Sequence, residues 1–134
     1  YLFDTFEGFL EEEKIHKKKH FVYKNLHIIR SNIKKFKLRN IRIYKCKFPY
    51  EVNSSIKKKK FKLCHLDVNT YKSTKKSFEF VKNRLIKGGI IVFDDYGIYE
   101  TDSIKKFVNQ ISIKHKEDFS FIYNFMGQCI LIKK

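Results

Sequence analysis

Apolar residues recur along the chain at two different spacings, and these spacings predict helices and strands in turn. Between Phe21 and Phe36 the apolar positions are three or four residues apart, which is the spacing of an amphipathic helix. A second helix is predicted from Ser73, as its N-cap, to the glycine pair of Lys87–Gly89, which would end it. A third helix is predicted over residues 101–114.

Short apolar runs between these helices predict strands at residues 1–6, 41–48, 61–68 and 88–93. Ile90–Phe93 is apolar at every position, which is typical of a strand buried on both faces of a sheet. Two further runs, 119–125 and 129–133, are separated by Met126-Gly127 and predict a hairpin. This order of elements indicates an α/β fold with a largely parallel sheet and an antiparallel strand at its end, and a basic linker is expected around residues 54–60.

Length and composition fit one packed domain. The chain has 134 residues, of which 43% are hydrophobic, and no apolar run approaches the 18 or more residues that a membrane span needs. The first residues carry no basic leader, so the cytoplasm is the expected location. The three cysteines are scattered and are expected to be reduced, mostly buried thiols.

The charge is strongly positive, with 30 Lys and Arg against 14 Asp and Glu, a formal net charge of +16. Such a charge attracts nucleic acid or anionic glycan, and a basic binding module is therefore one alternative. However, lysine dominates and its runs, such as Lys17–Lys19 and Lys57–Lys60, fall in predicted loops. A solvated lysine surface explains this pattern, and no nucleic-acid partner is expected.

Acidic residues follow three of the predicted strands, at Asp4, at Asp67 and at the pair Asp94-Asp95. Because the carboxyl ends of parallel strands meet at one edge of a sheet, Asp67, Asp94 and Asp95 are expected to converge there. Their oxygens suit Mg²⁺, and a cation at that edge could lower the pKa of a substrate hydroxyl. The alternative is that each acid caps the following helix. His65, beside Asp67, is expected to be buried and structural.

Three stretches of the chain resemble successive motifs of a known family. They are FDTFEG at residues 3–8, HLDVNTYKST at 65–74 and GGIIVFDDYG at 88–97. Their sequences, order and spacing resemble the macrocin O-methyltransferase (TylF-type) family. The resemblance covers essentially the whole chain and implies a Rossmann-like class I methyltransferase sheet, with S-adenosylmethionine and Mg²⁺ as cofactors.

The resemblance also implies roles for particular residues. Asp4 corresponds to the acid that binds the cofactor ribose, and Asp67, Asp94 and Asp95 correspond to the magnesium ligands, Asp67 also being a catalytic and cofactor-contacting residue. The family's candidate general base falls at Asn69, whose amide is not basic near neutral pH. Cys46 stands where the family usually has a glycine near the adenine, so its side chain would crowd the nucleotide.

The glycine-rich motif that class I methyltransferases carry after their first strand has no counterpart in the sequence, which contains five glycines and no GxGxG pattern. The chain is therefore interpreted as a single, N-terminally truncated methyltransferase domain over residues 1–134, lacking the first strand and expected to bind S-adenosylmethionine weakly by itself.

The sequence thus predicts an O-methyltransferase acting on a sugar, glycan-type or other hydroxylated small-molecule acceptor. A degenerate, non-catalytic remnant is the main alternative, because Asn69, Cys46 and the absent motif all depart from the family. A homo-oligomer is left open.

Overall fold

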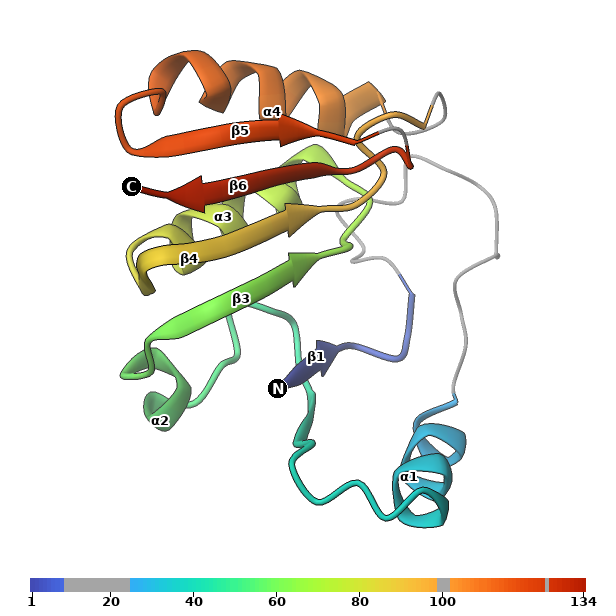
Figure 1. Cartoon of the computed structure of the whole chain (residues 1–134). Helices are drawn as coiled ribbons and strands as arrows, with labels where there is room; N and C mark the ends of the chain where they lie inside the picture. Colours follow the sequence, from blue (N-terminus) through green and yellow to red (C-terminus); the bar gives the residue numbers. More distant parts are fainter. Residues whose placement is uncertain (9–24, 99–101, 125) are drawn as a thin grey trace. The chain divides into compact units, whose positions relative to one another are not determined.

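The computed structural model describes residues 1–8, 25–98, 102–124 and 126–134 (Figure 1). These residues form two compact units, Tyr1–Ser54 and Ser55–Lys134. The strands belong to two separate sheets, one with two strands and one with four. Both the α/β class and the parallel pairing of strands predicted from the sequence are confirmed.

The first unit contains a small parallel sheet made by β1 (Leu2–Asp4) and β2 (Ile43–Lys45). Aromatic packing holds the two strands together, since the ring of Phe3 lies 5.2 Å from that of Tyr44 and 4.9 Å from that of Phe48. The helix predicted from Phe21 is described as α1 (Leu26–Lys35), and residues 21–24 lie outside the described part. No residue of α1 is buried.

The second unit contains a four-stranded sheet in the order β3-β4-β6-β5. β3 (Phe61–Leu66) and β4 (Leu85–Phe93) are parallel, whereas β6 (Cys129–Lys133) runs antiparallel to β4 and to β5 (Phe119–Tyr123), which confirms the predicted hairpin.

Two helices, α3 (Tyr71–Lys82) and α4 (Asp102–Lys114), complete the second unit. An aromatic core joins them to the sheet. The ring of Phe78 on α3 lies 5.9 Å from Phe93 on β4 and 5.7 Å from Phe107 on α4. These side chains and the apolar face of β6 are almost fully buried. The core therefore fixes the end of β4 from both helices.

The predicted end of the second helix is wrong. Helix α3 ends at Lys82, and Leu85 already belongs to β4, where it pairs with Phe61. The register between β3 and β4 then shifts, so that Leu63 pairs with Ile90. Gly88 (φ +70°) and Gly89, where a Cβ would lie 2.8 Å from the carbonyl oxygen of Ile86, lie in this irregular part of β4. The glycine pair therefore forms a bulge in a strand and does not cap a helix.

Two local expectations also need correction. The N-cap of α3 is Thr70, whose hydroxyl accepts a hydrogen bond from the amide of Ser73 at 3.2 Å, so Ser73 lies inside the helix. The expected basic linker begins with a helical turn, α2 (Ser54–Lys57), because Ile56 in it is only 1% exposed and anchors the segment by burial.

The expectation that a first strand is missing stays a prediction. None of the described helices is long and apolar enough to cross a membrane. The three cysteines are free thiols, as expected, but only Cys129 is fully buried, and burial raises the pKa of its thiol to about 12.

Candidate active site

Neighbouring strands β3 and β4 end side by side in the second unit. Leu66 pairs with Phe93 in the parallel register, and the amide of Asp94 donates to the carbonyl of Leu66 at 3.0 Å. Asp67 and Asp94 therefore leave the sheet at the same edge, as the sequence predicted. Parallel pairing is the reason, because it aligns the carboxyl ends of adjacent strands.

Asn69 links two of the carboxylates. Its amide nitrogen faces both of them, because the opposite orientation would place the amide oxygen against theirs. In this orientation the nitrogen donates to Oδ2 of Asp95 and, at 3.2 Å, to Oδ1 of Asp67. Asn69 and Asp95 both have a left-handed backbone, with φ of 56° and 60°, a conformation that Asn and Asp tolerate better than other side chains. The two loops thus turn back so that their polar side chains meet.

Asp94 is held by a different set of partners. Its Oδ1 accepts from the backbone amide of Asp95 at 3.1 Å and from Nε2 of Gln128 at 3.3 Å. Its Oδ2 lies 3.3 Å from Nε2 of His65. The His65 side chain is 50% exposed, so the expectation that it is buried is wrong. Its place on β3, two residues before Asp67, leaves it at the sheet edge, where it can orient Asp94.

Gln128 is a site residue that the sequence interpretation missed. The signal for it was present, because the predicted hairpin returns beside the strand that ends at Phe93. Phe93 pairs with Cys129 across β4 and β6, and this register puts Gln128 next to Asp94. Oδ1 of Asn124, on the other side of the hairpin, accepts from the backbone amide of Gln128 at 2.9 Å and so fixes the position of Gln128.

Tyr96 completes this edge on the side of α4. Its hydroxyl donates to Oδ1 of Asn109 at 2.9 Å, and its ring lies 4.9 Å from that of Tyr123. The next residue, Gly97, donates its amide to the carbonyl of Gly127 at 3.1 Å, and a Cβ on Gly97 would lie 2.9 Å from the Gly127 Cα. Glycine at position 97 therefore allows the loop after β4 to approach the hairpin closely.

Asp67, Asp94 and Asp95 form an acidic cluster, and this surrounding changes the pKa of the Asp95 carboxyl. Partial burial raises the pKa of its carboxyl above the usual value, and the nearby carboxylates of Asp67 and Asp94 raise it further. The folded chain therefore holds the Asp95 proton more tightly than the unfolded chain does. This contribution to stability is present below the unfolded pKa and is lost as pH rises through the raised pKa of the folded state.

Replacing Asp95 with Asn is expected to remove this pH-dependent loss, because the amide stays uncharged and can still accept from Asn69. Thermal unfolding without divalent cations should show a higher midpoint for Asp95→Asn than for the wild type at pH 7 and little difference near pH 3. A lower midpoint for the variant at pH 7 would contradict the repulsion inferred for this cluster.

Among the residues that the structure describes, no three His, Cys, Asp or Glu side chains are grouped as they would be around a metal ion. The predicted sharing of one cation by Asp67, Asp94 and Asp95 thus stays a prediction. Carboxylate oxygens are ligands that a hard cation prefers, and those of Asp67 and Asp95 lie close enough together for one amide nitrogen of Asn69 to contact both.

Asp4 lies in the first unit, at the end of β1. Its Oδ1 accepts from the amide of Phe6 at 2.6 Å, and its carbonyl accepts from the amide of Cys46 at 3.0 Å, so Cys46 follows the neighbouring strand beside it. Glu7 and Lys45 form an ion pair of 2.6 Å at the same end of this sheet. Together with Phe6 and Leu26 they line a hollow of about 240 Å³.

Similarity to solved structures identifies the fold as that of class I methyltransferases. The O-methyltransferase NovP is 13% identical, with a TM-score of 0.69 over 98% of this chain and 58% of NovP. CalS11, the TDP-rhamnose 3'-O-methyltransferase of calicheamicin biosynthesis, is 14% identical, with a TM-score of 0.60 over 97% of this chain and 56% of CalS11. The chain thus spans less than two thirds of either protein.

The family follows from a family model. The model of the macrocin O-methyltransferase (TylF) family matches residues 1–122, and the chain belongs to this family of methyltransferases. The resemblance seen in the three sequence motifs is therefore confirmed. A search of the curated proteins finds no match.

Proposed function

We propose that the chain is part of an S-adenosylmethionine-dependent, Mg²⁺-assisted O-methyltransferase that acts on a sugar or another hydroxylated small molecule. Membership of the TylF family supports methyl transfer to oxygen. The similarity to CalS11, named as a rhamnose methyltransferase, supports a sugar acceptor. The observation that carries the proposal is the meeting of Asp67, Asn69 and Asp95 at the ends of two adjacent parallel strands.

S-adenosylmethionine would supply an electrophilic methyl group. On this chain, Asp4 would bind the ribose, because one of its oxygens is fixed by the Phe6 amide while the exposed carboxylate keeps its second oxygen for a hydroxyl donor. Cys46, which is partly buried and follows β2 beside Asp4, would lie near the adenine, where its side chain would reduce the space for the nucleotide.

Asp67, Asp94 and Asp95 would hold the magnesium ion, whose chemistry is to lower the pKa of the acceptor hydroxyl and fix its direction. His65 and Gln128 orient the carboxylate of Asp94 by contacts of 3.3 Å each. Asn69 keeps the carboxylates of Asp67 and Asp95 together through its amide nitrogen. His65, Gln128 and Asn69 are therefore positioning residues for the acidic cluster.

The function is tested directly with the complete gene product, radiolabelled S-adenosylmethionine and a panel of sugars and nucleotide sugars. Methyl transfer is expected with Mg²⁺, and removing the cation with EDTA should lower its rate at least about 100-fold. Binding of S-adenosylmethionine without transfer to any acceptor would favour the alternative of a non-catalytic remnant. The observation behind this alternative is that Asn69, whose amide is not basic, stands at the position of the family's candidate general base.

Replacing Asn69 with Asp is expected to raise the rate of methyl transfer by about tenfold or more, because general-base catalysis contributes about 10²–10⁴-fold and an aspartate can accept the hydroxyl proton. Transfer is measured at saturating Mg²⁺, so that the charge of the cation offsets the repulsion that a further carboxylate adds beside Asp67 and Asp95 once the amide donor of Asn69 is lost. Asn32→Asp, which makes the same charge change at an exposed position of α1, serves as the control and should leave the rate unchanged. A rate for Asn69→Asp no higher than that of the control would show that position 69 does not lie beside the reacting hydroxyl.

A further inference from the structure

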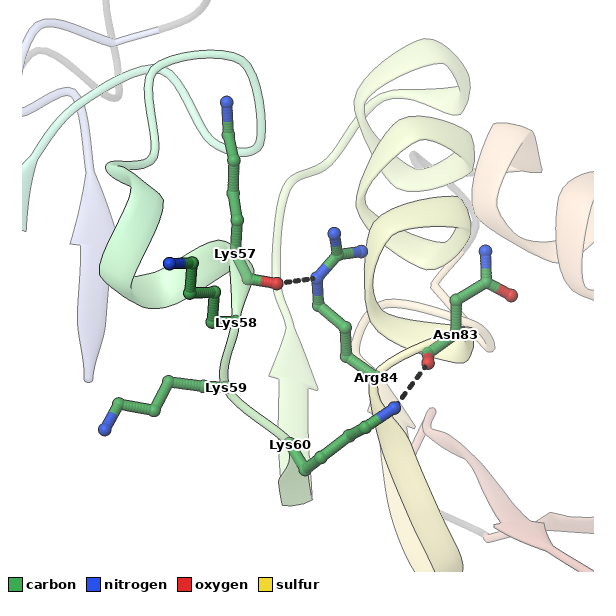
Figure 2. Close-up of a pocket in the computed structure, with 6 residues that line it drawn as sticks. All are labelled: Lys57, Lys58, Lys59, Lys60, Asn83 and Arg84. Carbon is green, nitrogen blue, oxygen red and sulfur yellow. Dashed lines mark hydrogen bonds between the residues drawn. The ribbon is translucent and has the colours of Figure 1, made fainter.

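A second polar pocket lies at the opposite end of β3 from the acidic cluster (Figure 2). Its volume is about 280 Å³, and the residues that line it are Lys57, Lys58, Lys59, Lys60, Asn83 and Arg84. Lys60 directly precedes β3, whereas Asp67 directly follows it. Six residues of extended strand span about 20 Å, so this pocket is separate from the candidate active site.

One wall of the pocket is a fixed guanidinium group. Nε of Arg84 donates to the carbonyl of Lys57 at 2.9 Å, and Nη1 donates to the carbonyl of Phe80 at 2.8 Å. The guanidinium also lies 3.9 Å from the centre of the Phe80 ring. Two of its five N–H donors are thus engaged, and three remain, one on Nη1 and two on Nη2. Arg84 is therefore held in place before any ligand binds, which lowers the entropy cost of using it.

Some of the cations around the pocket have a structural role. Nζ of Lys60 donates to the carbonyl of Asn83 at 3.4 Å, and Nζ of Lys133 donates to that of Lys82 at 3.2 Å. Together with Arg84 these groups satisfy the carbonyls at the C-terminal end of α3, where the helix dipole is negative. The capping of α3 thus explains Arg84, Lys60 and Lys133, but it does not explain the side chains of Lys58 and Lys59.

The remaining positive charge favours an anionic occupant. Lys58 and Lys59 are exposed, and the lining contains no carboxylate. Figure 2 shows the ammonium groups of Lys57, Lys58 and Lys59 pointing in different directions, with those of Lys58 and Lys59 on the side away from Arg84. These exposed side chains are flexible, and an anion bound beside the fixed Arg84 would attract their ammonium groups toward it.

The size and lining of the pocket favour a compact anion over a nucleic acid. A volume of about 280 Å³ is at the lower limit of small-molecule pockets and suits a short phosphate chain. No aromatic residue lines it, whereas proteins that bind single-stranded nucleic acids stack bases on aromatic side chains. We propose that this pocket binds a compact polyphosphate group, either inorganic or the phosphate chain of a nucleotide.

The proposal is tested by titration calorimetry of the 134-residue chain with sodium tripolyphosphate at 0.15 M NaCl. The double variant Lys58→Gln/Lys59→Gln should weaken binding at least about tenfold, because two charge-assisted contacts are lost. The matched control is Lys105→Gln/Lys106→Gln, a pair of consecutive, exposed lysines on α4 with the same loss of charge. The control should change the affinity less than about twofold, as expected for screened surface charges.

Two further ligands identify the source of the phosphate. Pyrophosphate and ADP binding with equal affinity would support recognition of the phosphate chain alone, whereas tighter binding of ADP would support a nucleotide. Equal weakening by both double variants would overturn the proposal, because binding would then follow the overall charge. An absence of saturable binding, or much tighter binding of a single-stranded oligonucleotide with the same number of phosphates, would overturn it as well.

Discussion

Replacing Phe78 with Ala is expected to destabilise the second unit by about 3–5 kcal/mol, the usual cost of removing a buried phenyl ring. The Phe78 side chain is 2% exposed and is the centre of the aromatic core. Its ring lies 5.9 Å from Phe93 and 5.7 Å from Phe107, and Phe119 on β5 is 6.0 Å away. The variant would therefore leave a cavity bordered by α4 and by two strands.

Urea unfolding followed by circular dichroism measures this loss. Phe36→Ala is the matched control, because Phe36 is 64% exposed and its removal should change the free energy of unfolding by less than about 0.5 kcal/mol. A loss below about 1 kcal/mol for Phe78→Ala would show that the core closes around the deletion. Phe93 packs on Phe78 and immediately precedes Asp94. The expected loss of unfolding free energy in Phe78→Ala would therefore also loosen the acidic cluster.

Much of the fold could be predicted from periodicity, because burial imposes a different spacing on strands and helices. Ile90–Phe93 illustrates this. Its continuous apolar run predicted a buried central strand, and β4 does lie between β3 and β6. The exit of Asp67 and Asp94 at the same edge of the sheet followed from the same reasoning, since adjacent parallel strands end at one edge. The family resemblance added the identity of the fold, which periodicity alone could not give.

The failures arose where one residue type serves two local structures. Gly88 and Gly89 are suited both to a helix C-cap and to a β-bulge, and only the pairing of Leu85 with Phe61 decides between them. Thr70 and Ser73 are both good N-caps, and the choice depends on which hydroxyl meets a free amide. His65 was expected to be buried because it lies in a strand, but β3 is an edge strand of its sheet and much of its length is exposed.

The partners of the acidic cluster were harder to predict for a different reason. Gln128 directly precedes β6 and is far from Asp94 in sequence, so its contact with Asp94 depends on the register between β4 and β6. Asn69 was recognised as a departure from the family, but the sequence could not show that its amide nitrogen lies between two carboxylates. In this respect the side chain stabilises the cluster through hydrogen bonds, a role that does not require basicity.

Replacing Asp94 with Ala in the complete gene product is expected to lower Mg²⁺-dependent methyl transfer at least about 100-fold, because the change removes a proposed metal ligand together with the anchor for His65 and Gln128. The fold should survive, since the Asp94 side chain is 29% exposed and its neighbours can be hydrated once the carboxylate is gone.

The control for this experiment is Asp118→Ala, which also removes an aspartate paired with a histidine, in this case His115 at 2.9 Å beyond the end of α4. Asp118 is on the surface, with a side chain 63% exposed, so its loss should change neither the rate nor its dependence on Mg²⁺. The rate is measured over a range of Mg²⁺ concentrations, with circular dichroism and thermal unfolding as checks on the fold. If Asp94→Ala binds Mg²⁺ as tightly as the wild type and turns over at the same rate, the contacts of Asp94 with His65 and Gln128 are structural, and the cation, if it is used, is held elsewhere.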